Sequence, residues 1–343
     1  MKEDRTIGMD VGDKSHALCV LNAQGAVEVR ERIANTKAAL QKFLSGYTRC
    51  VVALEAGTHS PWISREITRL GHRALVAQPR QVHLISGDEQ KCDERDAEHL
   101  ARLARVDPQL LHPIHHRGEQ AQADLAILRA RDGLVRARRL AINLARSLVK
   151  GVGARLPACS AEVFAKKAAA AVPELLKPAV EPLLATVAQL TQQIQVYDRN
   201  VQALVTRYPE AARMEVIPGV GPLTTMGYLL TVEDPRRFRK SRQVGPFLGL
   251  VPRRDQSGDT DKHLRIHKRG DGFVRRLLVS CAHYILGPFG PDSDLRRFGL
   301  RLAEHGGRFG KRRAVVAVAR KLAVLMHHLW STGAPYVPLR QAA

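Results

Sequence analysis

The sequence has few cysteines, few aromatic residues and no long apolar run. Its five cysteines are scattered and form no Cys-x-x-Cys pair, which excludes a disulfide framework and a cysteine zinc site. No apolar run is long enough to cross a bilayer, and the first residues, MKEDRTIGMD, lack the apolar core of a signal peptide. We therefore expect a cytoplasmic protein with reduced thiols and no membrane partner.

Acidic residues are also scarce relative to basic ones. The 343 residues include 54 Lys and Arg but only 33 Asp and Glu, a net charge of +21. Such an excess suits a polyanion, and nucleic acid is the usual one. A membrane surface is the weaker alternative, because the charge is not confined to one amphipathic segment. With 45% hydrophobic residues, the chain can form two or three domains with real cores.

The N-terminal third alternates between strand-like and helix-like segments. Three short β-like runs are separated by the turn signals GDK and NAQG, and two further strands alternate with helices. This order predicts a mixed sheet with helices packed on its faces, in a domain covering residues 1–118. The segments are three strands in 5–33, a strand in 48–58, a helix in 59–72, a strand in 73–79 and a helix that begins within 91–103.

The rest of the chain is predicted to be mostly helical. Residues 119–208 include a seam of apolar residues with alternating spacings of four and three, which favours a coiled coil joining domains or subunits. A long helix packed on its own domain is the alternative. Glycines and prolines predict loops and short helices over 151–182, and 209–343 form a third domain ending in an apolar helix over 312–330, where His327 and His328 are packing residues. The seam comprises Leu183, Val187, Leu190, Ile194, Tyr197, Val201 and Leu204.

The stretch KCDERDAEHLARL (residues 91–103) sets Asp93 and Asp96 three residues apart at the start of an expected helix. In a structural interpretation, Asp93 caps the helix and the acidic side chains stabilise its positive end. In a functional interpretation, the pair binds a divalent cation, because hard ions such as Mg²⁺ take carboxylate oxygens and relieve the repulsion. Further carboxylates elsewhere in the chain favour the second interpretation.

Two carboxylates lie where strands are expected to end. Asp10 ends the strand in IGMD, and Glu55 ends VVALE. Strand ends meet at one edge of a sheet, and several unpaired negative charges in one pocket would be destabilising without a cation. In a basic protein, we therefore predict that these two residues, with Asp93 and Asp96, bind Mg²⁺ or Mn²⁺ and act catalytically on a phosphodiester.

These segments together resemble a known family. IGMDVGDKSHALCVL, VALEAGT and KCDERDAEHLAR are similar to the acidic set of the RuvC-like (RNase H-like) domain of the IS110 family of bacterial insertion-sequence transposases, relatives of the Piv invertase. Cys92 stands where that family usually has threonine, and the acidic positions agree. The resemblance implies a RuvC-like fold. This half of the chain alone would also fit a resolvase or nuclease.

The third region combines a glycine turn with a strongly basic stretch. Gly219 and Gly221, in VIPGVGPLTTMGYL, can contact a backbone phosphate through their N–H groups between two short helices, although an ordinary turn would look the same. From Arg236 to Arg276, thirteen Lys and Arg stand against four Asp. Binding of this stretch to phosphates should weaken steeply with salt.

Ser257 lies within that basic stretch, in a segment expected to be a polar loop. A lone Ser-Gly is usually only a turn, yet a serine surrounded by cations suits nucleophilic attack on a phosphodiester, because the cations stabilise the alkoxide and the extra charge on phosphorus. The surrounding cations, also predicted to contact nucleic acid, are Arg253, Arg254, Lys262, Arg265, Lys268 and Arg269.

The same segment is similar to the C-terminal domain of the IS110 family. Gly249-Leu250-Val251-Pro252 through Ser257-Gly258, and Lys268-Arg269-Gly270, follow the family's pattern, whereas Asp259 replaces a residue that is often small. By this resemblance Ser257 is the nucleophile. The resemblance also implies donor and target DNA as substrates, a non-coding bridge RNA as guide, a dimer or tetramer with a site shared between subunits, and a place at the bacterial nucleoid.

Three interpretations of function follow. The first is a DNA transposase or recombinase with an acidic metal site and a serine nucleophile. The second is a metal-dependent junction nuclease, or a site-specific DNA invertase. The third is a basic scaffold protein without catalytic activity.

Overall fold

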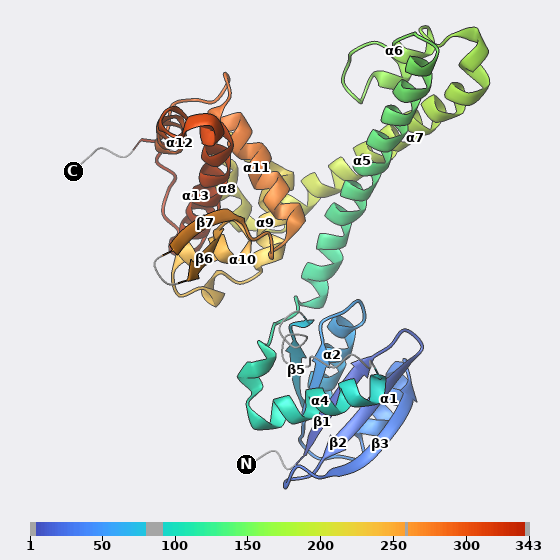
Figure 1. Ribbon diagram of the computed structural model, residues 1–343, viewed down its shortest axis with the longest axis vertical. Helices are drawn as coiled ribbons and strands as arrows, with labels where there is room; N and C mark the ends of the chain where they lie inside the picture. The colour runs from blue at the N-terminus through green and yellow to red at the C-terminus, as the bar shows by residue number, and fades with distance from the viewer. Residues whose placement is uncertain (1–4, 80–91, 258–259, 340–343) are drawn as a thin grey trace. The chain divides into compact units, whose positions relative to one another are not determined.

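The computed structural model describes residues 5–79, 92–257 and 260–339. The chain divides into two compact units, Met1–Arg117 and Gly118–Ala343, and each is described by itself (Figure 1). Lys91, Gly258 and Asp259 of the motifs above lie outside the described residues. Within those residues, no helix has the length and apolar character that crossing a membrane requires.

The first unit is built on a five-stranded mixed sheet, which confirms the predicted α/β class. The strand order is β3-β2-β1-β4-β5; β2 pairs antiparallel with β1 and β3, whereas β4 pairs parallel with β1 and β5. The strands are β1 (Thr6–Val11), β2 (Ser15–Leu21), β3 (Val27–Ala34), β4 (Val51–Glu55) and β5 (Arg73–Ala77).

Helices cover the two faces of this sheet. On one face, Ile7, Met9 and Leu54 pack with buried residues of α1 (Lys37–Leu44) and α2 (Ser60–Arg69). On the other face, α4 (Asp93–Val106) packs on small residues, including Ala17 and Ala53. Because side chains alternate along a strand, large residues fill one face and small ones let α4 approach the other closely.

The second unit begins with two long helices that pack against each other, α5 (Glu119–Gly151) and α7 (Lys177–Val205). The predicted long helix over the apolar seam is confirmed, and its buried seam residues, such as Val187 and Ile194, lie within this helix pair of one chain. The short helix α6 (Phe164–Ala169) packs beside them.

The expectation of loops and short helices up to residue 182 is wrong at its end. Helix α7 already begins at Lys177, with Pro178 in its first turn and Pro182 inside it. A proline in the first turn costs little, because the N–H groups there have no partner within the helix. Pro182 lies one turn further on and has no N–H. The carbonyl of Pro178 therefore lacks the helix hydrogen bond that it would otherwise accept.

The remainder of the second unit is mostly helical, as predicted, around one apolar core. Buried Tyr228 of α9 donates its hydroxyl to the Ala323 carbonyl, 2.8 Å away, so that α9 is fixed to α13. A two-stranded hairpin, β6 and β7, lies where a polar loop was expected. The elements are α8 (Ala212–Glu215), α9 (Pro222–Val232), α10 (Val244–Phe247), β6 (Pro252–Ser257), β7 (Thr260–Ile266), α11 (Gly272–Leu286), α12 (Asp294–His305) and α13 (Gly310–Thr332).

Candidate functional site

Asp10 and Glu55 lie at the same edge and on the same face of the sheet. Strands β1 and β4 are parallel and pair Met9 with Leu54, so the next residue on each strand is one of these carboxylates. Met9 and Leu54 belong to the α1–α2 face. By alternation, Asp10 and Glu55 therefore belong to the opposite face, which α4 covers.

The first turn of α4 lies at that same edge. Asp10 pairs with Ala17, which pairs with Arg32, and the Arg32 guanidinium contacts the Asp93 carboxylate at 3.1 and 3.2 Å. The row two residues before Asp10 on β1 consists of Gly8, Cys19 and Arg30, and Arg30 contacts Glu98 at 2.7 Å.

The helix therefore begins over the Asp10 row and runs back along β1, antiparallel to it. Gly8 permits this crossing, because a Cβ added there would lie 1.8 Å from the Ala97 carbonyl oxygen. The backbone thus brings the four predicted carboxylates, Asp10, Glu55, Asp93 and Asp96, to one edge of the sheet.

The side chains themselves do not form a closed metal site. Within 5–79, 92–257 and 260–339, no three His, Cys, Asp or Glu side chains are close enough together to hold a metal ion. Asp93 instead pairs with Arg32, and both side chains are about half exposed, at 52% and 49%. An exposed ion pair contributes about 1 kcal/mol or less, so a divalent cation can displace it. The donor set and its placement fit a hard cation.

Four residues that the sequence analysis missed, Asp13, His59, Trp62 and Asn35, link the turn after β1 to the segments that follow β4 and β3. His59 Nε2 lies 3.1 Å from an oxygen of Asp13, and the Trp62 indole N–H lies 3.4 Å from His59 Nδ1. Because an indole only donates, Nδ1 accepts and Nε2 donates to Asp13. Asn35 donates to the carbonyls of Gly12 and Asp13, at 3.1 and 3.0 Å. The turn signal GDK gave Asp13 no role beyond a turn.

Ser257 is the exposed last residue of β6 and pairs with Thr260 of β7. The register pairs Asp255 with Lys262 and Gln256 with Asp261, so alternation puts Lys262 on the face of Ser257. Arg254 is on the opposite face, where its guanidinium makes two 2.8 Å contacts with Asp261.

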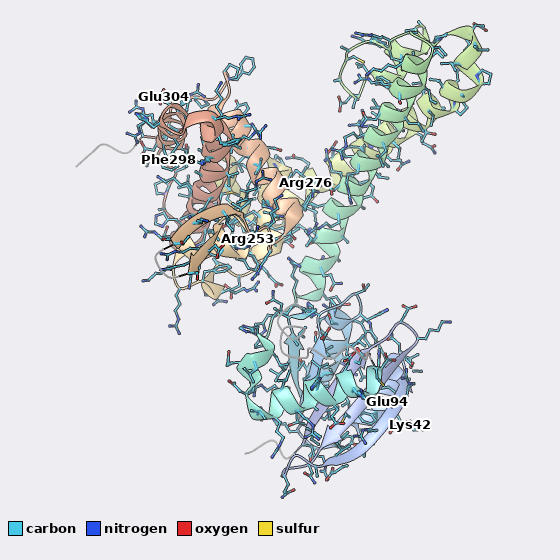
Figure 2. The ribbon with its side chains drawn as sticks, viewed as in Figure 1. Lys42, Glu94, Arg253, Arg276, Phe298 and Glu304 are labelled. Carbon is cyan, nitrogen blue, oxygen red and sulfur yellow. The ribbon has the colours of Figure 1, made fainter. Side chains whose placement is uncertain are left out.

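The structure therefore divides the predicted ring of cations around Ser257. Among the residues that the structure describes, Arg253, Lys262 and Lys268 have no carboxylate partner, and the same holds for Arg265 and Arg269. Figure 2 labels Arg253 among the side chains of the hairpin and Arg276 on α11, where Arg276 pairs with Asp132 at 2.7 Å.

The glycine turn connects two short helices, α8 and α9, as predicted. Gly219 is exposed with φ +85°, and a Cβ there would lie 2.6 Å from the Tyr284 ring. Gly221 is the N-cap of α9, and its carbonyl accepts from the N–H groups of Thr224 and Thr225 at 3.0 Å. Glycine is therefore required at residue 219 both by its backbone conformation and by the neighbouring ring.

Comparisons with known proteins agree with both halves of the chain. Residues 7–153 match the DEDD transposase family of IS110, and residues 211–293 match the transposase IS116/IS110/IS902 family. The transposase for insertion sequence element IS1328 of Yersinia enterocolitica is 32% identical over 282 residues, which cover 80% of this chain and 82% of that protein. A probable family 20 transposase of Pseudomonas aeruginosa is 29% identical, with 97% and 98% covered.

The pilin gene-inverting protein of Moraxella lacunata is 25% identical over 147 residues, 40% of this chain and 44% of that protein. The full-length likeness to transposases, the order of the two matched regions and the acidic residues at one sheet edge agree with one another. The chain belongs to the IS116/IS110/IS902 family of insertion-sequence transposases.

Proposed function

We propose that this transposase cuts and rejoins DNA strands through Ser257, with a divalent cation at the acidic edge of a RuvC-like domain and a structured bridge RNA as its guide. The observation on which this depends is the chemistry of two places in the fold. Four carboxylates belong to one sheet edge. An exposed serine ends a strand of a hairpin in which several cations have no carboxylate partner among the described residues. Family membership supports DNA as the substrate, and the resemblance supports the RNA guide.

The proposed step conserves the phosphodiester. The Ser257 hydroxyl oxygen bonds to phosphorus, the bond from phosphorus to one sugar oxygen breaks, and the hydroxyl proton passes to the departing oxygen through a neighbouring group. A sugar hydroxyl of another strand then attacks the phosphoserine linkage and releases the serine. No high-energy cofactor is required, because each bond broken is replaced by one of the same kind.

This chain's cations stabilise the charge that develops in that step. A serine hydroxyl is too weakly acidic to attack unaided at neutral pH, so the alkoxide must be stabilised or its proton removed. Lys262 shares the face of Ser257, and Arg253 has no carboxylate partner among the described residues. Mg²⁺ or Mn²⁺ at Asp10, Glu55, Asp93 and Asp96 would supply Lewis-acid polarisation of a phosphate oxygen.

A covalent adduct tests the serine assignment. Wild-type protein is incubated with labelled element-end DNA, the matching RNA and Mg²⁺, and is then run on a denaturing gel. We expect a slow, protease-sensitive band that Ser257→Ala abolishes while nucleic-acid binding persists, and that Ser257→Cys retains weakly. Thr260→Ala is the matched control, because Thr260 is the hydroxyl residue paired with Ser257. Nicked product without an adduct in any of these proteins would instead identify a metal-only nuclease.

Inversion of a DNA segment is the second candidate activity. The likeness to a pilin gene-inverting protein over 147 residues favours it, since inversion and transposition can use the same strand exchange. A substrate with two element ends in opposite orientation distinguishes the two activities, because an invertase flips the segment and a transposase moves it.

A further inference from the structure

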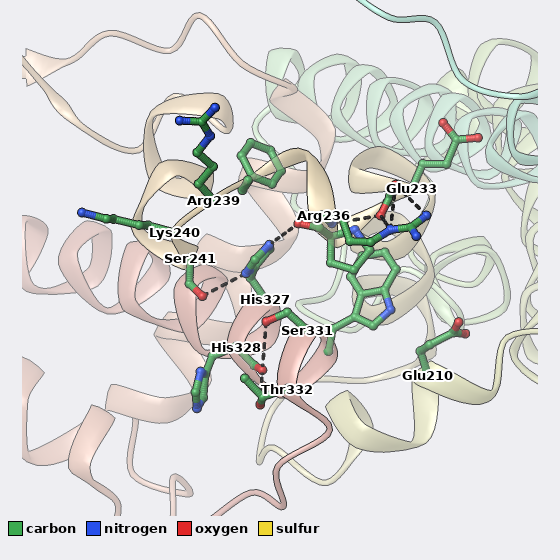
Figure 3. A pocket seen from close by; sticks show the side chains of 14 residues that line it. Glu210, Glu233, Arg236, Arg239, Lys240, Ser241, His327, His328, Ser331 and Thr332 are labelled. Carbon is green, nitrogen blue, oxygen red and sulfur yellow. Dashed lines mark hydrogen bonds and ion pairs between the residues drawn. The ribbon is translucent and has the colours of Figure 1, made fainter.

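A hollow in the second unit is lined by a segment that lies between the glycine turn and the hairpin in sequence, and one of its walls is held in place by a buried histidine. The hollow has a volume of about 820 Å³ and lies between the segment 233–241, the end of α13 and Glu210 (Figure 3). Pockets that hold small ligands have volumes in this range. Neither the acidic edge nor Ser257 lines it.

Buried His327 holds one wall of this hollow in place. Its Nε2 lies 2.9 Å from the Pro235 carbonyl and its Nδ1 2.9 Å from the Ser241 hydroxyl, and it is 2% exposed. A carbonyl only accepts, so Nε2 carries the proton and Nδ1 of the neutral ring accepts from Ser241. Phe238 packs edge-on against the same ring, with centroids 5.6 Å apart. The segment 235–241 is thus fastened to α13 at both ends.

Two exposed cations on this wall are available to bind an anion. Arg239 and Lys240 are exposed and have no carboxylate partner in the part of the chain that the structure describes. Arg236 differs from them, because its guanidinium is held by Asp234 through contacts of 3.0 to 3.3 Å. In Figure 3, Arg239 and Lys240 lie together on one side of the hollow, next to Ser241.

The other lining groups are an aromatic ring and a carboxylate. Half-buried Trp330 packs on the core beneath, and its indole N–H has no acceptor among residues 5–79, 92–257 and 260–339. Glu210 lies on the side opposite Arg239 and Lys240 and has no cation partner within those residues. The hollow therefore offers separate places for an anion, a flat ring and a hydrogen-bond donor.

We propose that this hollow binds an unpaired ribonucleotide of a single-stranded RNA segment, with its base stacked on Trp330, a phosphate at Arg239 and Lys240, and a ribose hydroxyl donating to Glu210. Stacking requires an unpaired base, because bases in a duplex cover each other's faces. DNA lacks the 2′-hydroxyl and so cannot donate this hydrogen bond to Glu210. The proposal rests on the proposed function, because it locates a contact for the guide RNA.

Tryptophan fluorescence tests the proposal directly, because the chain has only two tryptophans. In a protein with Trp62→Phe, the tryptophan fluorescence comes from Trp330 alone. The same protein also carries Ser257→Ala, so that it cannot cleave through the proposed nucleophile. We expect an eight-residue single-stranded oligouridylate to quench this fluorescence and to bind more tightly than the matching deoxyribonucleotide. Unchanged Trp330 fluorescence at saturation, or equal affinity for the two oligonucleotides, would overturn the proposal.

Variants measured by fluorescence anisotropy of a labelled oligoribonucleotide test each contact. Trp330→Ala should weaken binding roughly tenfold, and Trp330→Phe should retain most of it. Glu210→Gln should narrow the preference for RNA over DNA. Arg239→Ala should weaken binding and reduce its salt dependence by about one phosphate contact. Arg313→Ala, which removes an exposed arginine of α13 outside both the lining and the stretch from Arg236 to Arg276, is the matched control.

Equal losses in Arg239→Ala and Arg313→Ala would show a diffuse charge effect and contradict the assignment. The binding assay contains no reaction step. If no covalent adduct forms but RNA still quenches Trp330, the serine mechanism is refuted and the RNA site is supported. If the adduct forms but RNA does not quench Trp330, the RNA site is refuted and the serine mechanism is supported.

Discussion

Asp93 pairs with Arg32 in the structure, and we propose that it binds a divalent cation in the active enzyme. The Arg32 guanidinium holds its carboxylate at 3.1 Å, and a divalent cation at the acidic edge would compete for the same oxygens. We expect Arg32→Ala to raise the affinity for Mn²⁺ by severalfold, since an exposed ion pair contributes about 1 kcal/mol or less. Isothermal titration calorimetry of the protein without nucleic acid measures this change.

Arg30→Ala is the control for that experiment. Arg30 lies two residues before Arg32 on β3, is similarly exposed, and pairs with Glu98, which is outside the proposed site. Hydrogen bonds from Arg30 and Arg102 hold the pKa of Glu98 below its usual range. An equal gain in Mn²⁺ affinity for both variants would mean that only net charge matters, and would remove Asp93 from the ligand set.

Gly8 is required by the close approach of α4 to β1. Its added Cβ would meet the Ala97 carbonyl oxygen and the Ala101 nitrogen at 1.8 and 2.6 Å, both of them backbone atoms. Gly8→Ala must therefore push α4 away, and we expect it to destabilise the protein by about 1–3 kcal/mol and to displace Asp93 and Asp96. Urea unfolding and strand-transfer assays check the two effects. A stable, active Gly8→Ala protein would contradict the placement of α4 against β1.

Gly133→Ala should have the opposite effect on stability. Gly133 lies inside α5, and a Cβ there meets nothing within 4 Å. Alanine is favoured over glycine in a helix by about 1 kcal/mol, so this variant should be more stable than the wild type.

At the scale of elements, buried Asp124 joins α5 to the residues that follow α7. Its carboxylate accepts from Arg207 and the Tyr208 hydroxyl, each at 2.6 Å, and from Gln120 at 3.0 Å. We expect Asp124→Asn to cost about 2–3 kcal/mol in unfolding free energy, because the hydrogen bonds lost are to a charged group. Asp198→Asn, which breaks the ion pair between half-exposed Asp198 and Arg131, should cost less than about 1 kcal/mol.

The pH dependence of stability checks the same contact. Burial, followed by the hydrogen bond to Asp124, raises the pKa of Tyr208 from 10.0 to about 12. A raised pKa means that the stabilising contribution is complete below pH 10 and is lost as the pH rises to about 12. This alkaline loss should be smaller in Asp124→Asn, and an identical loss in both proteins would contradict the role of the hydroxyl.

The apolar seam shows why sequence predicts an element better than its partner. The spacing from Leu183 to Leu204 correctly predicted one long helix, because periodicity reports which face is buried. It could not identify the covering surface, and the structure shows α5 of the same chain packed against it. Self-association through this helix stays a prediction.

The acidic edge was predictable because its residues follow simple signals. Asp10 and Glu55 end apolar runs, and Asp93 begins a helix, so their backbone positions follow from local rules. The bond between Asp13 and His59 was not predictable, because it joins two loops 46 residues apart in the chain. The β6–β7 hairpin was missed because its strands are exposed and polar, and they lack the apolar alternation that identifies a strand.

At the scale of the whole molecule, the proposed chemistry is divided between two compact units. The carboxylates belong to the unit that ends at Arg117, and Ser257 belongs to the unit that begins at Gly118. The excess of positive charge lies almost entirely in the second unit, which has 37 Lys and Arg against 18 Asp and Glu, whereas the first has 17 against 15; attraction to nucleic acid is therefore expected mainly of the second unit. Because the two parts belong to different units, we expect the acidic edge of one subunit to act with the serine of another, which is the shared site that the family resemblance implies.

Mixing two inactive variants tests this sharing. Asp10→Asn and Ser257→Ala should each abolish strand joining, and co-expression in equal amounts should restore it. In a random mixture of symmetric dimers, half are mixed, and each mixed dimer has one site with both an intact acidic edge and an intact serine. Activity should then return to about a quarter of the wild-type level. A site formed within one chain gives no such rescue, because every chain in the mixture lacks one of the two parts.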